Sequence, residues 1–222
     1  MKVKVVSKIL EANERIAEEN RRLFSDKALF VVNLMSSPGA GKTTVLEKTV
    51  QLLKKNKIEA GVIEGDIAGT ADAERLSALD VPVVQINTGG ACHLDANMIN
   101  DVLSELPLDN LDILFIENVG NLVCPAEFKV GEDAKVMILS ITEGDDKPLK
   151  YPLMFQESSV LLLNKMDLAG HVDVDIDKIR RDVHSLNRGI EIFECSAKQG
   201  KGLDPWISWL EKRMKSPKTQ KR

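Results

Sequence analysis

The sequence predicts an α/β protein whose central sheet is mostly parallel and carries helices on both faces. Apolar, β-branched runs of strand length recur along the chain, and helical patterns separate most of them. Strands that are apolar along their whole length are buried on both faces, which is typical of parallel sheets. The expected strands lie at residues 28–35, 57–65, 81–87, 111–118, 134–142, 159–165 and 190–196.

Helical spacing is clear in three segments between or after these runs, at residues 43–56, 177–187 and 203–214. In the first of them, four aliphatic side chains share one stripe: Val45, Leu46, Val50 and Leu53. The first 24 residues have the pattern of a separate amphipathic helix. Its apolar side is expected to contain Val6, Ile9, Ile16 and Leu23.

Length and composition exclude several classes of protein. The 222 residues suffice for one domain with an extension, and the 43% of hydrophobic residues supply an aliphatic core. The formal net charge of -4 argues against nucleic-acid binding. No apolar run approaches the ~20 residues of a membrane span, and the N-terminus does not resemble a signal peptide. Three cysteines are too few for a disulfide framework, so we expect a reduced, cytoplasmic protein.

The segment S-S-P-G-A-G-K-T-T, residues 36–44, joins the first expected strand to the helix after it. Glycines there let backbone N–H groups converge on an anion, and the helix N-terminus adds its dipole. Lys42 supplies a cation for the β- and γ-phosphates, and Thr43 offers a hydroxyl to Mg²⁺. The pattern G-x-x-x-x-G-K-S/T expects glycine where this chain has Ser36, which we take as tolerated because the N–H donors remain. This predicts a P-loop NTPase fold, with phosphates held by Gly39, Ala40, Gly41, Lys42, Thr43 and Thr44.

Two further strand ends predict a guanine site. Asp167 in N-K-M-D can accept hydrogen bonds from N1–H and the exocyclic amine of guanine, whereas adenine would leave this carboxylate unpaired. Lys165 can lay its aliphatic stem on the base, and Asn164 can tie this loop to the phosphate loop. In C-S-A-K, the N–H of Ala197 is expected to donate to O6. The second motif contributes Ser196, Ala197 and Lys198 to the predicted nucleotide site.

Acidic residues at two other strand ends predict a Mg²⁺ site, because Mg²⁺ prefers carboxylate ligands and phosphoryl transfer requires it. Asp66 ends V-I-E-G-D, and F-I-E-N-V-G holds Glu117 and Gly120. We predict catalytic roles for Lys42, Asp66 and Glu117, and assign Mg²⁺ to Thr43, Asp66 and Glu117. Gly120 has the spacing of a glycine whose N–H contacts a γ-phosphate. The alternative for each acid is a solvated strand end.

A second group of metal-ligating residues lies at Cys92, His93 and Cys124. Thiolate and imidazole suit Zn²⁺ or Ni²⁺, although adjacent ligands are not the spacing of a closed zinc site. From spacing alone, a metal site and buried structural cysteines remain equal alternatives. Cys195 is interpreted as a packing residue, and the other two histidines, His171 and His184, as surface residues.

Taken together, seven motifs closely resemble the HypB family of hydrogenase nickel-incorporation GTPases, over about residues 28–213. They are S-S-P-G-A-G-K-T-T, V-I-E-G-D-I-A-G-T-A-D-A-E-R-L, T-G-G-A-C-H-L-D-A, F-I-E-N-V-G-N-L-V-C-P-A-E-F, T-E-G-D-D-K-P-L-K-Y-P, N-K-M-D-L and C-S-A-K. The resemblance implies a SIMIBI-class P-loop GTPase that binds GTP and GDP with Mg²⁺, forms a GTP-promoted homodimer and binds Ni²⁺ or Zn²⁺ at Cys92, His93 and Cys124. It implies a HypA-type nickel-binding partner and the hydrogenase large subunit as client.

The same resemblance matches Lys150 to a lysine that reaches the neighbouring subunit's nucleotide, although Lys147 could do the same and both could be solvated loop charges. From this resemblance together with the residue patterns at the two ends, we predict a helical extension at 1–27, a GTPase domain with inserted metal-site segments at 28–213 and a basic tail at 214–222. Some relatives carry an N-terminal cysteine motif or a histidine-rich store. Residues 1–27 contain neither Cys nor His, which argues against such a store here.

Three other functions compete with this interpretation. A urease-type nickel GTPase would share the mechanism, but the Cys-His pair and the N-L-V-C-P run favour the hydrogenase type. A P-loop kinase would have no use for the guanine motifs. A pure metal carrier with a vestigial nucleotide site would lack GTP turnover. Because no arginine finger or water-orienting glutamine is evident, we expect slow intrinsic turnover.

Overall fold

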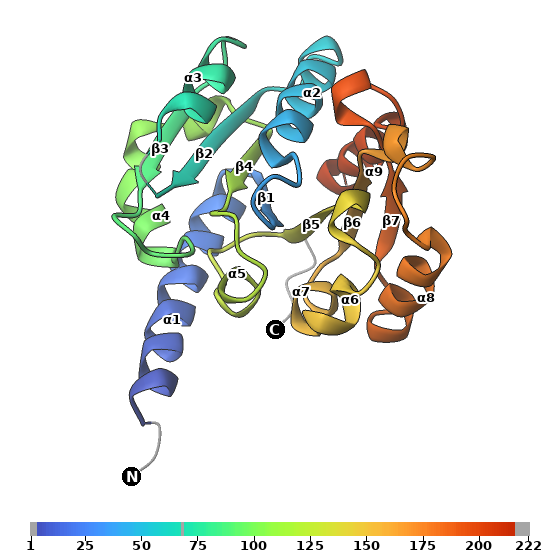
Figure 1. The fold of residues 1–222 in the computed structure, drawn as a ribbon. Coiled ribbons are helices and arrows are strands. Elements are labelled where there is room, and N and C mark those ends of the chain that lie inside the picture. Colours follow the sequence, from blue (N-terminus) through green and yellow to red (C-terminus); the bar gives the residue numbers. More distant parts are fainter. Residues whose placement is uncertain (1–3, 68, 216–222) are drawn as a thin grey trace.

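The structure, a computed structural model, describes residues 4–67 and 69–215 and contains one seven-stranded sheet in the order β3-β2-β4-β1-β5-β6-β7 (Figure 1). Every neighbouring pair of strands is parallel. The predicted α/β fold with a parallel sheet is confirmed. The strands are β1 (Phe30–Ser36), β2 (Ala60–Asp66), β3 (Val83–Asn87), β4 (Ile113–Glu117), β5 (Ala134–Ser140), β6 (Val160–Asn164) and β7 (Glu191–Glu194).

Helices cover both faces of the sheet, and the buried clusters show which helices share a face. Helices α2, α3 and α9 pack on one face, whereas α1, α4, α5, α7 and α8 pack on the other. The described helices are α1 (Lys4–Asp26), α2 (Lys42–Lys55), α3 (Ala71–Ser77), α4 (Ala96–Val102), α5 (Cys124–Glu127), α6 (Lys147–Lys150), α7 (Pro152–Gln156), α8 (Ile176–Leu186) and α9 (Asp204–Lys215).

The central strands are buried along their whole length, as continuous apolar runs predict. In β1, successive side chains point to opposite faces, so Val32 packs in the cluster beneath α2 while Val31 packs in the cluster beneath α1 and α4. Fully burying one aliphatic side chain contributes ~1.5–3 kcal/mol. Because the sheet is all parallel, the carboxyl ends of β1, β2, β4 and β6 meet at one edge, where the predicted motifs follow them.

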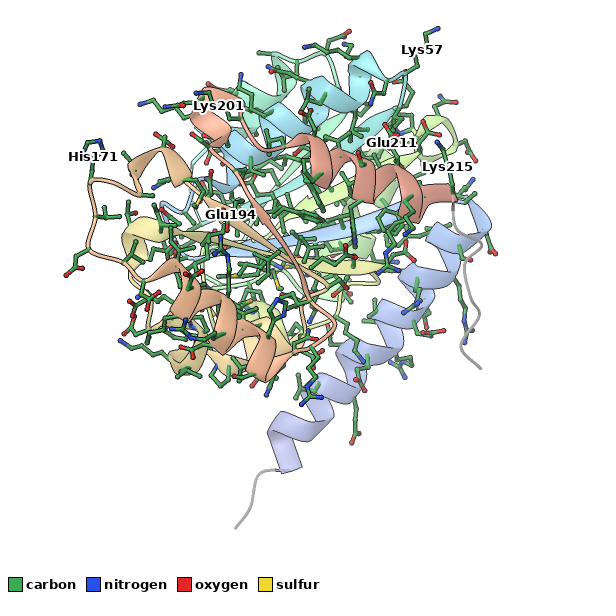
Figure 2. All side chains as sticks on the ribbon, turned by 90° about the vertical axis from the view of Figure 1, so that its right-hand side faces the viewer. Lys57, His171, Glu194, Lys201, Glu211 and Lys215 are labelled. Carbon is green, nitrogen blue, oxygen red and sulfur yellow. The ribbon has the colours of Figure 1, made fainter. Side chains whose placement is uncertain are left out.

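Helix α1 forms as predicted, but its buried side differs from the expected one. Ile16 and Leu23 are only half-buried, and the side chains of Val6 and Ile9 lie outside the described residues. The buried row instead contains Asn13, Ala17, Asn20 and Phe24. Two of these residues are polar, so an apolar pattern could not find the row. The first turns of α1 extend beyond the rest of the chain (Figure 2).

The C-terminal region is described as far as residue 215, where α9 ends. Most of the predicted basic tail, residues 216–222, lies outside the described residues. Within the described part of the chain, no helix combines the length and apolar character needed to cross a membrane.

Candidate functional site

The phosphate loop begins where β1 ends and leads directly into α2. Gly41 precedes α2 with a left-handed backbone (φ 98), and a Cβ there would lie 2.7 Å from Asn164 Nδ2. Glycine is therefore required both for the backbone conformation and for the close approach. Ser36, where the motif expects glycine, ends β1 without a positive φ, and its hydroxyl donates to the Ser37 carbonyl at 2.7 Å. The serine is accommodated because the turn to positive φ comes later in the loop.

A cavity of about 400 Å³ lies beside this loop and contains the predicted phosphate and Mg²⁺ residues Lys42, Thr43, Asp66 and Gly120. Gly120 approaches the loop so closely that an added Cβ would lie 3.0 Å from the Pro38 nitrogen. Any larger residue would push the two segments apart. The segment after β4 is thus held directly against the phosphate loop.

Glu117 is buried next to the lining residues Lys42 and Thr43 and is 3% exposed. Its Oε1 accepts a hydrogen bond from Thr43 Oγ1 at 2.8 Å and lies 3.9 Å from Lys42 Nζ. Burial raises the pKa of Glu117, while Lys42 and the Thr43 hydrogen bond oppose the rise. The solvated strand end considered from the sequence is therefore wrong for Glu117.

Glu64 is a second buried carboxyl that the sequence motifs did not single out. It pairs in register with Glu117 across β2 and β4 and is 3% exposed. Burial, and then the charge of Glu117, raise the pKa of Glu64 to about 8. An acid inside the otherwise apolar strand V-I-E-G-D was the signal that could have found it. Oε2 of each carboxyl is buried without a hydrogen-bond partner, so the pair can accept a cation nearby.

Asp66 ends β2 at the mouth of the same cavity. Its two carboxylate oxygens accept backbone N–H groups from Ile67 at 2.6 Å and Gly69 at 2.9 Å, which fix the side chain. Arg75 of α3 also borders this cavity and was not predicted. It donates to Glu47 at 2.7 Å and to Asp72 at 2.9 Å.

The predicted guanine motifs come together on the other side of the phosphate loop, around a cavity of about 540 Å³. Asn164 Nδ2 donates to the Ala40 carbonyl at 3.0 Å, and Lys165 Nζ donates to the Gly39 carbonyl at 2.7 Å. The predicted tie between Asn164 and the phosphate loop is present. The cavity is bordered by Gly41, Thr44, Lys48, Arg75, Asn164, Lys165, Asp167, Leu168 and Lys198.

The carboxylate of Asp167 is exposed and accepts a hydrogen bond from the Ser196 hydroxyl. The Ala197 N–H donates to Asn164 Oδ1 at 3.1 Å, because that buried amide oxygen needs a donor. In this structure the N–H is therefore engaged, and its expected bond to guanine O6 stays a prediction.

The three residues of the second motif also come together, although 32 positions separate the two cysteines. Cys92 Sγ lies 3.3 Å from Cys124 Sγ and 3.7 Å from His93 Nδ1, and all three ligand atoms lie within 4.8 Å of one another. Four-coordinate metal ions with thiolate and imidazole ligands need spacings of this size. Burial lowers the pKa of His93, which favours the neutral imidazole that binds metal. The donor set therefore fits Zn²⁺ or Ni²⁺ with one position left open.

Two asparagines connect this cluster to the segment that follows Glu117. Asn118, fully buried, accepts the Leu94 N–H at 2.9 Å and donates to Asn33 Oδ1 at 3.2 Å. Asn121 Nδ2 donates to the Cys92 carbonyl at 3.1 Å. The loop of Cys92 and His93 is thus bonded on both sides to the segment that contains Gly120 and Cys124.

Comparisons with known proteins agree with this arrangement. The family model described as CobW/HypB/UreG, nucleotide-binding domain, matches residues 30–194. The chain is 51% identical over 203 residues to hydrogenase maturation factor HypB of Escherichia coli (strain K12), covering 91% of this chain and 70% of the relative. The chain belongs to the HypB family.

Two more distant HypB proteins match over nearly their whole length. The probable hydrogenase maturation factor HypB of Methanocaldococcus jannaschii is 39% identical over 214 residues, covering 96% of each chain. The crystal structure of HypB from Helicobacter pylori in complex with nickel superimposes with a TM-score of 0.86 at 37% identity, covering 91% of this chain and 95% of that one. The described fold is therefore the HypB fold.

As a member of the HypB family, the chain is a P-loop GTPase that binds GTP and GDP together with Mg²⁺. The two cavities flank the phosphate loop and share Gly41, Thr44 and Arg75, so one nucleotide can extend across both. The unpartnered oxygens of Glu64 and Glu117 fit a site that accepts a divalent cation.

The remaining predicted residues of this HypB chain lie apart from the two cavities. Lys150 is exposed on α6 with its Nζ 3.9 Å from Asp146, and it borders neither cavity. His171 and His184 are exposed, as predicted. Cys195 is buried, as predicted, and burial raises its thiol pKa to about 12.

Proposed function

We propose that this chain is a GTP-hydrolysing metallochaperone that assists nickel insertion into nickel–iron hydrogenase, with metal binding coupled to GTP-dependent dimerisation. Two hydrogen bonds to the loop of Cys92 and His93 carry this proposal: Asn118 accepts the Leu94 N–H, and Asn121 donates to the Cys92 carbonyl. Through them, one short segment contacts both the phosphate loop and the metal-ligand cluster. The relatives' names, hydrogenase maturation factor, support the client enzyme.

In the proposed nucleotide site, Lys42 contacts the β- and γ-phosphates, and the Gly120 N–H contacts the γ-phosphate. Mg²⁺, when bound, neutralises charge that develops on the phosphates. Thr43, Asp66 and Glu117 would hold it, with Glu64 beside them. Asp167 and Ala197 would read the guanine edge, and the bond from Ser196 to Asp167 Oδ1 supports an orientation in which the remaining lone pairs of the carboxylate accept the two guanine donors.

In the proposed metal site, Cys92, His93 and Cys124 supply three ligands to nickel or zinc. The relative solved with nickel supports nickel as the cargo. A fourth ligand is needed for a closed tetrahedral site, and a second copy of this chain could supply it. Three cysteines that are all free in the structure also fit a reducing cytoplasm.

Dimerisation is supported by exposed apolar side chains near these motifs. Val123 beside Cys124 is 54% exposed, and Leu149 beside Lys150 is 56% exposed. Burying such side chains between two copies would be favourable. The dimer would bring Lys150 towards the neighbour's nucleotide. A HypA-type nickel-binding protein as partner belongs to the same proposal.

The proposed coupling between GTP and metal binding depends on the segment after β4, residues 118–121. A γ-phosphate that attracts the Gly120 N–H would shift Asn118 and Asn121, and these would shift Cys92 against Cys124. By linkage, GTP must then change metal affinity by the same factor by which metal changes GTP affinity.

To test the proposal, Ni²⁺ or Zn²⁺ is titrated into the protein with either GDP or a non-hydrolysable GTP analogue bound. The molecular mass in solution, measured in parallel, shows whether the protein is a monomer or a dimer in each state. We expect different metal affinities in the two states and a dimer with the analogue. Cys92→Ala and Cys124→Ala should each lose stoichiometric binding. Undiminished binding in both variants would place the site elsewhere, and equal affinities in the two nucleotide states would remove the coupling.

A further inference from the structure

We propose that Asn13 and Asn20 of α1 are positioning residues for the cluster of Cys92, His93 and Cys124, because their side-chain amides tie together the two loops that contain these ligands. The inference rests on the metal site of the proposed function. It gives the N-terminal helix a role that its apolar pattern did not indicate.

Asn13 bridges the two loops with one amide group. Its Oδ1 accepts the Ala96 N–H at 2.8 Å, and its Nδ2 donates to the Lys129 carbonyl at 2.8 Å. Ala96 begins α4 directly after the loop of Cys92 and His93, and Lys129 follows the short helix α5 that begins at Cys124. One side chain thus joins the ligand-bearing loops from behind.

Asn20 makes a second bridge, about two turns further along the same face of α1. Its Nδ2 donates to the Ala96 carbonyl at 2.8 Å and to the Val130 carbonyl at 3.3 Å, and its Oδ1 accepts from Asn100 Nδ2 at 2.8 Å. The loop approaches α1 so closely that a Cβ at Gly131, whose φ is +103, would lie 2.8 Å from Asn20 Cβ. The N–H and the carbonyl of Ala96, the first residue of α4, are therefore both bonded to α1, the first by Asn13 and the second by Asn20.

Burial makes these bonds selective for one arrangement of the loops. Asn20 is 0% exposed and Asn13 is 7% exposed, so water cannot replace the lost partners if a loop moves. A buried amide left without partners is costly, which holds Ala96, Lys129 and Val130 at fixed separations. Because the ligands stand a few residues from these anchors, α1 sets the distance between Cys92 and Cys124 in advance of metal binding. Groups that hydrogen-bond metal ligands directly typically change metal affinity 10- to 100-fold when they are replaced, and we expect the lower end of this range for Asn13 and Asn20, which act through the backbone.

If α1 only stabilises the fold, replacing Asn13 should lower stability without a specific loss of metal affinity. A matched variant elsewhere in the fold distinguishes this role from the positioning role. Asn187 also donates its amide to backbone carbonyls, those of Phe155, Gln156 and Ser158, and it belongs to neither ligand loop. Asn187→Ala therefore removes the same kind of bonds at another place in the fold. Stability measured by thermal unfolding shows whether the two variants are destabilised to a similar extent.

The first experiment titrates Co²⁺ into the full chain with GDP bound and follows its thiolate charge-transfer and d–d absorption. For Asn13→Ala we expect at least about tenfold weaker binding and altered d–d bands, since the ligands are no longer held at one spacing. Asn187→Ala should bind as the unmodified protein does. Equal affinity and identical spectra for Asn13→Ala and Asn187→Ala would overturn the proposal.

The second experiment needs no substitution in α1, so it tests the role of α1 even if Asn13→Ala fails to fold. If docked α1 favours metal binding, metal must stabilise docked α1 by the same factor. Hydrogen exchange over residues 10–26 should therefore slow on addition of Zn²⁺, and unchanged exchange would contradict the role of α1. Cys92→Ala is the reference. If Cys92→Ala still binds metal, the metal site itself is misplaced. If Cys92→Ala loses metal but Zn²⁺ leaves α1 exchange unchanged in the unmodified protein, the metal site holds and only the role of α1 is wrong.

Discussion

Glu64 and Glu117 face one another in register on β2 and β4, and each is only 3% exposed. Lys42 Nζ, 3.9 Å from Glu117, is the cation paired with Glu117 in the described part of the chain. Two buried carboxyls close to one ammonium cannot both ionise readily without a further cation. We therefore expect the nucleotide-free, Mg²⁺-free protein to hold a proton at this pair at neutral pH.

This pair makes the stability of the nucleotide-free, Mg²⁺-free protein depend on pH. The pKa of Glu64 is raised from its ordinary 4.5 to about 8, so the folded state keeps a proton that the unfolded chain has lost between these values. This contribution is present at low pH and is lost as the pH rises through about 8. Glu64→Gln mimics the protonated form, and its stability relative to the unmodified protein should rise by on the order of 3 kcal/mol between pH 5 and 8.

Thermal unfolding in EDTA at several pH values measures this difference, with Glu59→Gln, in the exposed loop before β2, as control. A difference between Glu64→Gln and the unmodified protein that does not change with pH would contradict the raised pKa.

Lys42→Ala should abolish GTP hydrolysis and weaken nucleotide binding. The mobile cation opposite the β- and γ-phosphates is lost, and charge developing in the transition state is no longer neutralised. We expect a loss in kcat of at least about 100-fold, measured as phosphate release with saturating GTP. Lys54→Ala on the same helix, where the lysine pairs with Asp80 at the surface, should hydrolyse GTP normally. Normal turnover in Lys42→Ala would exclude this phosphate site.

Asp167→Asn should change the nucleotide preference of the protein from GTP to xanthosine triphosphate. The amide oxygen can still accept from the Ser196 hydroxyl, while the amide N–H₂ donates to the carbonyl that xanthine has in place of the guanine amine. Competition binding of the two triphosphates measures the change. Asp173→Asn, an exposed aspartate outside both cavities, serves as control and should keep the preference for GTP. An Asp167→Asn variant that still prefers GTP would show that another residue reads the base.

Asn121→Ala should weaken the coupling between nucleotide and metal more than it weakens either binding event. The bonds that Asn121 makes to the Cys92 carbonyl, the Val123 N–H and the Cys124 side chain are lost, whereas the three predicted ligand atoms and the phosphate loop are unchanged. We expect the ratio of metal affinities in the GDP and GTP-analogue states to move towards one. Isothermal titrations in both states measure it, and a ratio equal to that of the unmodified protein would exclude Asn121 as a connection.

Alkylation of the folded protein should distinguish the cysteines. Cys92 is exposed, whereas Cys195 is buried and its thiol pKa is raised to about 12. Because the thiolate is the reactive form, iodoacetamide at pH 8 should label Cys92 and leave Cys195 unmodified until the chain is unfolded. Peptide mass spectrometry locates the label. Rapid labelling of Cys195 in the folded protein would contradict its placement beneath the Asn164 loop.

The fold class and most of the nucleotide site were predictable because they depend on short segments of sequence. Continuous β-branched apolar runs separated by helical patterns favour parallel strands buried on both faces, and such strands bring their carboxyl ends to one edge. The phosphate loop needs particular residues at particular places, as the left-handed Gly41 illustrates. The division into three segments at 27 and 213, and the roles of the individual site residues, stay predictions.

Other features depend on pairings between distant segments, which a local pattern does not contain. Asn13 and Asn20 are polar and did not belong to the apolar side expected for this helix, yet they are buried because carbonyls more than 70 positions away accept their bonds. Glu64 is part of the site only because β2 lies beside β4 in a register that sets it opposite Glu117. Cys92 and Cys124 are neighbours for the same kind of reason. Whether a polar side chain can be buried is decided by its partners, and the packing of the folded chain determines which partners it meets.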